Sequence, residues 1–338
     1  MPKVDATRVL AVNAGTTSLK LSVVSAGERL AETTIEHWAG QDLSGLETFL
    51  RGAHGVDAVA RRVVHAVTRL GDSVRLDGDL LDRLDSLSAL SPRHDPRAVR
   101  FIRRVCEVVD LSTVLCFDTA FYRTIPPEAA IFALRAPWSE EGERGNGAAQ
   151  GLSHAHVVRR TAELVGRPAD RVSPVSCHLG SSSSLAAVRH GRCVDTTFGF
   201  TLQEGLSAVT RADTQPAGIT GYSGDMREIL DGKRRGDSTC EQALAIYMHR
   251  LCREAGAMVA AAGPLDALAF TGGVGEGSVE VRAHLSGALA HLGVQFDADR
   301  NAGVTEGVIS PEAAGVSTLI VRAGEDLEMA REVDHLLG

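Results

Sequence analysis

Short apolar runs alternate with amphipathic stretches along most of the chain. Residues 8–13, 19–24, 59–64 and 113–117 are rich in Val, Leu and Ala, and runs of this length predict buried strands. Stretches with helical spacing of their apolar positions lie between and after these runs. Because strands that alternate with helices are typical of α/β layers, the pattern predicts an α/β protein.

The clearest predicted helices lie in the second half of the chain. Ser238-Thr239-Cys240-Glu241 has the pattern of a capping box, in which a hydroxyl and a carboxylate each accept a hydrogen bond from a backbone N–H at the helix start. From Leu244 to Val259 the apolar residues share one helical face, and Gly263-Pro264 predicts the end of that helix. A last helix is predicted from about Glu325 to Leu337.

One arrangement occurs twice at a long interval. Residues 8–27 comprise a predicted strand, the turn Gly15-Thr16-Thr17-Ser18, a second strand and a turn glycine. Residues 172–191 repeat this order around Gly180-Ser181-Ser182-Ser183-Ser184. A period this long indicates a duplicated domain rather than a solenoid, and ligands are commonly bound between two such domains. These turns offer backbone N–H groups and hydroxyls to phosphate oxygens, although a single copy is more often a plain hairpin turn.

A third glycine-rich segment covers residues 271–277, between the apolar run 265–270 and a predicted helix that begins near Ser278. A strand, a glycine turn and a helix N-terminus together form a platform for nucleotide phosphate or ribose. The spacing is not that of the Rossmann fingerprint, and the chain has no G-x-x-x-x-G-K-[ST] loop. These two common nucleotide-binding motifs are therefore excluded.

Composition and charge argue against several classes of function. With 35 Lys and Arg against 43 Asp and Glu, the formal net charge is -8, which disfavours a nucleic-acid surface and anionic membranes. No apolar run reaches the length of a membrane-spanning helix, and the first residues lack a signal-peptide core. The six cysteines have neither CxxC nor zinc-site spacing, so we expect free thiols in a reducing cytoplasm.

A set of motifs in a fixed order spans nearly the whole chain. They are Asn13-Ala14-Gly15-Thr16-Thr17-Ser18-Leu19-Lys20, Arg62-Val63-Val64-His65, Phe117-Asp118-Thr119-Ala120-Phe121, residues 178–184, Gly199-Phe200-Thr201 with Glu204-Gly205-Leu206, Thr210-Arg211, Gly224-Asp225-Met226-Arg227, residues 271–276 and Glu325-Asp326-Leu327. This ordered set resembles the acetate kinase (carboxylate kinase) family of the acetate and sugar kinase, Hsc70 and actin superfamily. The set is far more specific than any single motif.

The resemblance implies a duplicated two-domain α/β fold, the actin-like ATPase fold, with an ATP cleft between the domains. Residues 1–122 with 326–338 would form domain I, on the substrate and phosphate side. Residues 123–325 would form domain II, on the nucleotide side. The resemblance also implies a homodimer that forms through domain II.

The same resemblance implies a kinase that uses ATP and Mg²⁺ to phosphorylate a carboxylate, giving an acyl phosphate and ADP. The catalytic residues would be Arg62, His94, Asp118, Gln150 and Arg211. The nucleotide would contact Asn13, Thr16, Ser18, Lys20, His178, Gly180, Ser181, Ser182, Asp225, Arg227, Gly273, Gly275 and Gly277. Asp118 and Glu325 would organise Mg²⁺. Taken alone, Arg62 would more often be an exposed ion-pair residue, and Asp118 a helix cap or turn residue.

The residue types suit this chemistry. A carboxylate substrate, with a pKa of ~4, is already ionised at neutral pH and needs no general base to attack phosphorus. Phosphoryl transfer then requires alignment and charge neutralisation, which two guanidinium groups and Mg²⁺ supply. A metal-organising role for Asp118 is therefore better motivated than proton abstraction.

Several positions depart from the family pattern. Gln150 stands where the family has a histidine, and glutamine donates hydrogen bonds but carries no charge. Ser181-Ser182 replace Asn-Gly, and Gly277 replaces an asparagine. These departures motivate an alternative, a nucleotide-binding regulatory protein that has lost turnover, although the retained charged residues argue against it. A kinase that acts on a hydroxyl is a further alternative, with Asp118 as the base.

The predicted acyl pocket also differs from the family pattern. Arg93 replaces a leucine, Ala149 replaces an aromatic residue and Leu202 replaces a proline. A larger pocket with a cation near its entrance would favour a longer or doubly acidic substrate. We therefore predict that acetate is not the preferred acceptor.

Overall fold

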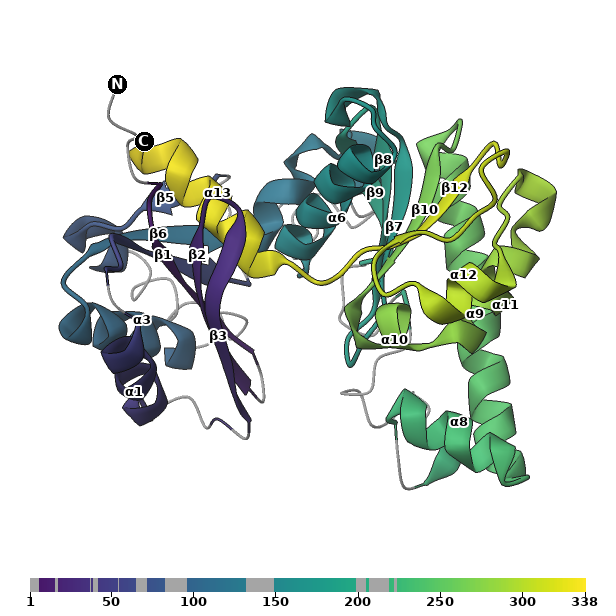
Figure 1. The fold of residues 1–338 in the computed structure, drawn as a ribbon, viewed down its shortest axis with the longest axis horizontal. Coiled ribbons are helices and arrows are strands. Elements are labelled where there is room, and N and C mark those ends of the chain that lie inside the picture. Colours follow the sequence, from purple (N-terminus) through teal and green to yellow (C-terminus); the bar gives the residue numbers. More distant parts are fainter. Residues whose placement is uncertain are drawn as a thin grey trace. The chain divides into compact units, whose positions relative to one another are not determined.

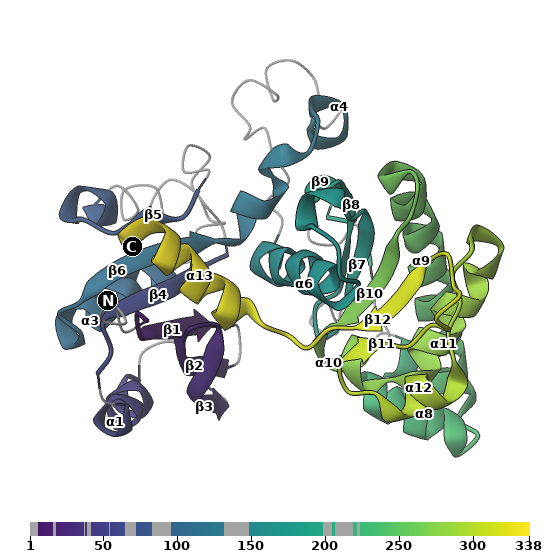
Figure 2. The same ribbon diagram turned by 45° about the horizontal axis from the view of Figure 1, so that its top comes forward.

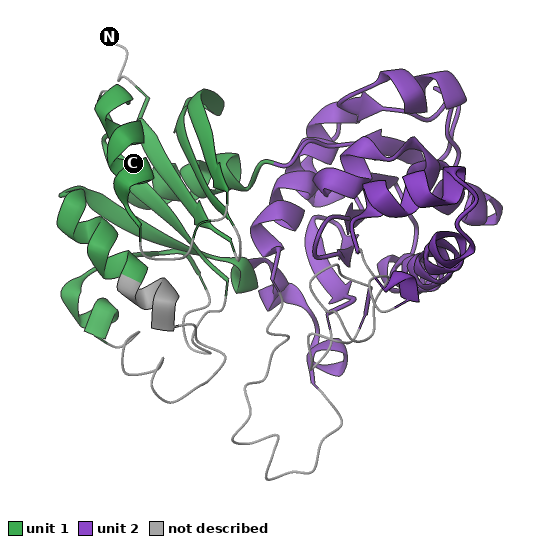
Figure 3. Cartoon of the chain, turned by 90° about the horizontal axis from the view of Figure 1, so that it is seen from below, with its two compact units in different colours: residues 1–120, 324–338 green, residues 121–323 purple. Residues whose placement is uncertain are grey.

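A computed structural model of the chain describes residues 6–15, 18–36, 38, 42–53, 55–64, 72–82, 96–131, 149–198, 205–206, 219–221 and 224–338. The chain divides into two compact units (Figure 3). The first comprises residues 1–120 and 324–338, and the second comprises residues 121–323. Figures 1 and 2 show how strands and helices are layered within each unit.

The first unit is built on a mixed sheet of six described strands in the order β3-β2-β1-β4-β6-β5. The strands are β1 (Val9–Ala14), β2 (Ser18–Ser25), β3 (Glu28–Glu36), β4 (Ala58–Val63), β5 (Val74–Arg75) and β6 (Ser112–Phe117). β1, β4 and β6 run parallel, while β2, β3 and β5 pair antiparallel with their neighbours. The predicted strands of this half of the chain are confirmed to within two residues at each end.

Helices cover both faces of this sheet. α1 (Ser44–Gly52) and α3 (Pro96–Val108) bury Leu46, Phe101 and Val105 against strand residues of one face. α13 (Glu325–Leu337), the predicted last helix, packs on β1, β2, β4 and β6 (Figure 1). Cys116 in β6 donates from its thiol to the carbonyl of Met329 in α13, which places that helix on the opposite face. The C-terminal segment therefore completes the unit that the N-terminus begins.

The second unit repeats this topology strand for strand. Its sheet order is β11-β12-β10-β7-β8-β9 among the described residues. The strands are β7 (Pro174–His178), β8 (Ser184–Arg189), β9 (Arg192–Thr196), β10 (Ala267–Thr271), β11 (Gly307–Val308) and β12 (Ser317–Ile320). As in the first unit, the three parallel strands β7, β10 and β12 carry antiparallel neighbours on both sides. The predicted duplication is confirmed.

The repeat extends to the turn between the second and third strands of each unit, which joins β2 to β3 and β8 to β9. Ala26 and Gly27 have φ of 51° and 78°, and His190 and Gly191 have φ of 50° and 75°. Two consecutive residues with positive φ are the geometry of a type I′ turn, whose twist matches that of the flanking strands. At Gly191 a side chain would also lie 2.6 Å from the carbonyl oxygen of Ala169, so this glycine is required twice over.

Helices again flank the second sheet. α6 (Gly151–Leu164) packs on β7 and β10, whereas α8 (Met226–Arg234), α9 (Ser238–Ala262) and α11 (Val279–Ala288) contribute to the largest apolar cluster with β7, β8 and β10. Shorter helices are η1 (Asp118–Thr124), α4 (Pro127–Ala130), η2 (Ala169–Arg171), α10 (Gly272–Gly277), η3 (Ala290–Leu292) and α12 (Ala298–Gly303). In the described ranges, no helix combines the length and the apolar character that crossing a membrane requires.

The start of α9 differs from the prediction. Asp237, not Ser238, is the N-cap, and its carboxylate accepts hydrogen bonds from the N–H groups of Thr239 and Cys240 at 2.9 and 3.3 Å. The predicted capping box was wrong because Ser238 already has helical geometry, so its hydroxyl is one position too late to cap. The predicted end is confirmed, since Gly263 terminates the helix with φ of 78°.

The cysteines are all free, as predicted. Cys116, Cys177 and Cys193 are buried, and burial raises the pKa of each thiol. These thiols therefore stay protonated and behave as small apolar side chains of the two cores.

Candidate active site

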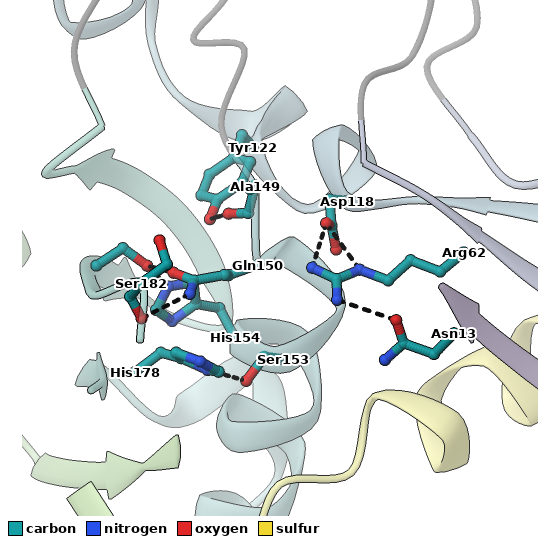
Figure 4. A network of polar contacts seen from close by, with 11 residues as sticks. Asn13, Arg62, Asp118, Tyr122, Ala149, Gln150, Ser153, His154, His178 and Ser182 are labelled. Carbon is teal, nitrogen blue, oxygen red and sulfur yellow. Dashed lines mark hydrogen bonds and ion pairs between the residues drawn. The ribbon is translucent and has the colours of Figure 1, made fainter. Parts of the chain in front are cut away.

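In the first unit, a charged cluster lies where the parallel strands end. Arg62 of β4 donates from Nε and Nη2 to Oδ2 of Asp118, at 3.0 and 2.7 Å, and from Nη1 to Oδ1 of Asn13 at 3.2 Å (Figure 4). Asn13 is near the end of β1, and Asp118 directly follows β6. The side chain of Asp118 is 0% exposed. Three predicted site residues, from strands far apart in the sequence, thus meet at the edge where α/β sheets usually bind ligands.

The neighbouring arginine has a different environment. Because successive strand residues point to opposite faces, Arg61 lies under α3, where its guanidinium stacks 4.4 Å from the ring centroid of Phe101. It donates from Nη1 to the carbonyl of Phe101 at 3.1 Å, and burial lowers its pKa. Arg62 pairs in register with Cys116, whose thiol contacts α13, so Arg62 lies on the other face. Because side chains alternate along the strand, Arg61 belongs to the core and Arg62 to the candidate site.

Two further predicted residues, Ser18 and Lys20, lie on the neighbouring strand β2. Lys20 is exposed on β2 and directly opposite Asn13, so both side chains project from the same face. Ser18 begins β2, and its carbonyl accepts from the N–H of Gly15 at 2.8 Å. Thr16 and His94 lie outside the described residues.

The start of α13 is fixed to the sheet by an ion pair that the sequence did not reveal. Asp326 accepts hydrogen bonds from Arg29 Nε, Arg29 Nη2 and Ser22 Oγ, each at 2.7 Å. Burial would raise the pKa of Asp326, but the hydrogen bonds from Arg29 and Ser22 outweigh burial and lower it. This bidentate pair sets the position of the adjacent Glu325, the predicted Mg²⁺ residue, which is half-buried at the first position of the helix.

In the second unit, two of the predicted phosphate loops lie side by side. Leu179 donates from its N–H to the carbonyl of Thr271 at 2.9 Å, and the carbonyl of Leu179 accepts from Val274 and Gly275 at 2.8 and 3.1 Å. Gly272 has φ of 79°, and a Cβ there would lie 2.7 Å from the carbonyl oxygen of Leu179. Only glycine satisfies both conditions, so this glycine allows the two loops to approach.

Residues 272–277 form the short helix α10, where the sequence predicted a glycine turn. Glycines have low helix propensity, so the helical geometry must come from tertiary contacts. The buried Arg282 supplies them at the far end, where it donates to the carbonyls of Gly275 and Glu276 at 2.9 and 2.6 Å. Glu276 in turn accepts from the N–H groups of Gly272 and Ala323, both at 3.0 Å.

A buried polar network lies next to the second phosphate loop. Gln150 precedes α6 with φ of 68°, and its Nε2 donates to the carbonyl of Ser182 at 3.0 Å (Figure 4). Ser184 donates from its hydroxyl to Gln150 Oε1. His154 contacts Ser184 Oγ through Nε2 and Ser176 Oγ through Nδ1, both at 2.8 Å.

His178 belongs to the same region, since its Nδ1 lies 2.7 Å from the hydroxyl of Ser153 (Figure 4). Gly180 and Ser182 are in the loop that follows His178, and Ser181 is exposed there. The structure therefore brings Gln150 together with His178, Gly180 and Ser182. The participation of Ser153, His154 and Ser184 was not predicted.

Comparison with known proteins shows the family of the chain. Residues 42–217 and 214–331 match the model of the Acetokinase family. The chain belongs to the acetokinase family. The acetate kinase of Thermotoga maritima is 34% identical over 315 residues, which cover 83% of this chain and 78% of that protein. The acetate kinase of Streptomyces avermitilis is 34% identical over 364 residues, which cover 97% of this chain and 90% of that protein.

Solved structures agree with the acetokinase fold. A propionate kinase from Francisella tularensis has a TM-score of 0.86 and 25% identity, with 98% of this chain and 100% of that chain covered. Porphyromonas gingivalis acetate kinase also has a TM-score of 0.86, with 24% identity and the same coverage. The predicted family and the predicted two-domain fold are confirmed.

The other predicted nucleotide residues of this acetokinase-family chain are an ion pair at the start of α8 and two glycines of α10. Asp225 caps α8 and forms an ion pair of 2.6 Å with Arg227, which is 88% exposed. The hydrogen bond from Arg227 lowers the pKa of Asp225. Gly273 and Gly277 would meet no atom within 4 Å if they carried a Cβ, so their neighbourhood is open. Arg211, in a predicted motif of the family, lies outside the described residues.

Proposed function

We propose that the protein transfers a phosphoryl group between ATP and a small carboxylate, giving an acyl phosphate and ADP. The observation that carries the proposal is the contact of Arg62 with Asp118 and Asn13 at the carboxyl ends of β1, β4 and β6. It supports the proposal because a guanidinium held in place by two partners can bind phosphoryl oxygens with little loss of side-chain entropy.

The described residues fit a nucleotide phosphate. The positive φ of Gly272 and the short distance from an added Cβ to the carbonyl oxygen of Leu179 leave room for backbone, but not for a side chain, where the two loops meet. A Cβ on Gly180 would lie only 3.8 Å from the backbone nitrogen of Gly273. A turn and the start of a helix that lie side by side, both with backbone N–H groups, suit anion binding. We propose that Gly180, Ser181, Ser182, Gly273, Gly275 and Gly277 contact the nucleotide, together with Asn13, Thr16, Ser18, Lys20, His178, Asp225 and Arg227.

Two carboxylates are proposed to hold a metal ion that the nucleotide brings with it. Mg²⁺ commonly takes one or two protein carboxylates, with phosphate oxygens and water as its other ligands. Asp118 and Glu325 are carboxylates of the first unit, and we propose that they would organise Mg²⁺. Bound Mg²⁺ would supply charge neutralisation to the phosphates.

A carboxylate acceptor is favoured over a hydroxyl. A hydroxyl would need a base, and Asp118 was the candidate for that role. Two N–H groups of Arg62 already donate to Asp118 Oδ2, so this oxygen is engaged with the guanidinium rather than directed at an acceptor hydroxyl. An ionised acid needs no proton removed. Arg211 and His94 are proposed to complete the charge around the acceptor, and Gln150 to donate a hydrogen bond.

Two further proposals concern substrate and assembly. The names of the relatives, acetate kinases and a propionate kinase, support a short monocarboxylic or related acid as acceptor. We propose a homodimer formed through the second unit, which is domain II of the sequence prediction, and a cytoplasmic location.

Matched acceptor pairs test the choice between acid and alcohol. ADP release from Mg-ATP would be measured with propionate and 1-propanol, and with succinate and 1,4-butanediol, which differ only in the acceptor group. We expect turnover with an acid and none above the ATPase background with its alcohol. Turnover with the alcohols alone would replace the carboxylate kinase proposal with a hydroxyl kinase.

A further inference from the structure

The polar network beside Gln150 has a single arrangement of donors and acceptors. A carbonyl oxygen can only accept, so the Gln150 atom that faces the carbonyl of Ser182 must be the amide nitrogen. The amide oxygen therefore faces Ser184 and accepts the hydroxyl proton of that residue. A serine hydroxyl has one proton, so toward His154 the Ser184 oxygen can only accept.

This arrangement fixes the tautomer of His154. Its Nε2 must carry a proton in order to donate to Ser184. His154 is 0% exposed, and burial, followed by the proximity of His178, lowers its pKa well below the usual value. The ring is therefore neutral, so Nδ1 is unprotonated and accepts from the hydroxyl of Ser176. Hydrogen bonds run in one direction from Ser176 through His154, Ser184 and Gln150 to the carbonyl of Ser182.

The ring of His154 has little freedom to choose another arrangement. The ring of Phe121 stacks on it with centroids 5.9 Å apart. Among the residues that the structure describes, the titratable side chains whose rings pack against it are Tyr122 and His178, both with centroids 6.3 Å away. Rotation of the imidazole would leave buried hydroxyls without partners, which costs about 1–3 kcal/mol for each group.

We propose that His154 is a positioning residue for Gln150: its Nε2–H, acting through Ser184, holds the Gln150 carboxamide with the nitrogen toward Ser182 and so determines that position 150 presents a neutral donor. One amide proton of Gln150 is used on Ser182, and the second is left to donate to an oxygen of the reacting groups. The inference rests on the proposed function, in which Gln150 contacts the acceptor or the phosphoryl group. Reversal of the amide would present an oxygen, which repels both.

Nitrogen NMR of the ¹⁵N-histidine-labelled protein tests the tautomer without any need for turnover. The resonance of His154 would be assigned by its loss in His154→Gln. We expect a neutral ring with the proton on Nε2 from about pH 5.5 to about pH 8.5, where an exposed histidine titrates. In Ser184→Ala the Nε2 signal should shift, because its acceptor is gone. A proton on Nδ1, or an imidazolium that titrates in this range, would overturn the proposal.

A double-mutant cycle tests the functional part. His154→Leu should lower kcat by roughly 10- to 100-fold, because misplaced contacts have effects of this size, while KM for ATP stays the same. In a Gln150→Ala background the same change should lower kcat no further. His154→Gln, whose Nε2 can still donate to Ser184, should retain kcat within about threefold. His249→Gln, at an exposed position of α9, is the matched control.

The mutant cycle and the NMR measurement together distinguish a positioning role of His154 from a structural role. Equal losses of kcat from His154→Leu in the wild-type and Gln150→Ala backgrounds would show that His154 supports the fold rather than Gln150. If His154→Leu does not fold, Ser184→Ala breaks the same connection with a smaller change of volume and takes its place in the cycle. If the wild-type protein phosphorylates no acid, the proposed function fails, and the NMR result alone still decides whether Nε2 of His154 donates to Ser184.

Discussion

Arg62 and Asp118 are joined through one oxygen: Nε and Nη2 of the guanidinium donate to Oδ2 of the carboxylate, at 3.0 and 2.7 Å. Their strands, β4 and β6, are parallel neighbours, and both residues lie at the carboxyl ends. The pair is largely shielded from water, so solvent screens the attraction between the two charges only weakly. Substitutions here must therefore be interpreted for stability and for turnover separately.

The adjacent arginines Arg61 and Arg62 provide a matched test of the charge clamp. Arg62→Met should lower kcat by roughly 10²-fold or more, because a contact to transition-state charge is lost. It should also lower the free energy of unfolding by about 3–5 kcal/mol, because the buried carboxylate of Asp118 loses both hydrogen bonds from Arg62. Arg61→Met should retain wild-type turnover, since Arg61 stacks on Phe101 away from the site. Steady-state kinetics and chemical denaturation measure both quantities.

Stability and turnover separate in a double variant. Arg62→Met with Asp118→Asn removes both charges, so we expect it to recover most of the lost stability and none of the turnover.

Arg211→Ala should also reduce turnover by roughly 10²-fold. Wild-type kcat in Arg62→Met would show that Arg62 has only a structural role.

Gly272 and Gly256 differ in whether the local backbone requires glycine. Gly272→Ala should destabilise the protein by about 1–3 kcal/mol, because its φ of 79° is strained for alanine and its Cβ would meet Leu179. Gly256→Ala, inside α9 with no atom within 4 Å of the added Cβ, should be neutral or stabilise by up to about 1 kcal/mol. Equal effects of the two substitutions would contradict the assigned backbone geometry.

The same Gly272 variant bears on nucleotide binding. Mg-ATP should raise the melting temperature of the wild-type protein, because a ligand that binds only the native state stabilises it, by about 2.7 kcal/mol at a hundredfold excess over Kd. Gly272→Ala should lose most of this shift, and Gly256→Ala should keep it. A wild-type melting temperature that saturating Mg-ATP does not change would rule out the nucleotide site.

The buried His154 predicts an acid-sensitive term in stability. Burial, followed by His178, holds its pKa well below the usual value, so below about pH 6.5 the unfolded chain binds a proton that the folded state does not. The free energy of unfolding should therefore fall as pH decreases below that value, by up to about 1.4 kcal/mol per pH unit from this group. The difference between wild-type and His154→Gln curves isolates the term. Parallel curves from about pH 7 to about pH 5 would contradict it.

The predicted preference against acetate stays a prediction. Of the three changed pocket positions, only Ala149 is among the described residues; it is half-buried beside Tyr122, whose hydroxyl donates to its carbonyl at 2.7 Å. Arg93 and Leu202 lie outside the described residues. We expect propionate to exceed acetate in kcat/KM by about fourfold, since each buried methylene adds about 0.8 kcal/mol. Butyrate, with a second methylene, and succinate or malonate, whose second carboxylate would pair with Arg93, should exceed acetate by roughly tenfold or more. Acetate with the highest value, unchanged in rank by Arg93→Leu, would refute this prediction.

Local patterns predicted much of the fold. The first hairpin, the end of α9 at Gly263 and the whole of α13 depend on neighbouring residues, so a sequence contains their signals. The helix α10 was not predicted because glycines disfavour helices, and the stabilising Arg282 is contributed by the following helix.

The sequence predicted the part of the candidate site that follows from strand order, but not the part that depends on tertiary packing. Asn13, Arg62 and Asp118 meet because parallel strands end at one edge, which follows from the α/β pattern. The connection from His154 through Ser184 to Gln150 joins α6 to β8, and only the tertiary packing of these elements brings the three residues together. Arg61 and Arg62 are the same residue type side by side in the sequence. Only the structure shows which face of the sheet each side chain lies on.

Trapping of the product tests the central claim most directly. The protein would be incubated with Mg-ATP, hydroxylamine and each acid of the panel, and acyl hydroxamate would be measured, because hydroxylamine captures an acyl phosphate as it forms. We predict hydroxamate from at least one acid, in an amount equal to the ADP released, and a roughly hundredfold slower rate with Arg62→Met. Stabilisation by Mg-ATP without hydroxamate from any acid would contradict the account and favour a nucleotide-binding regulatory protein.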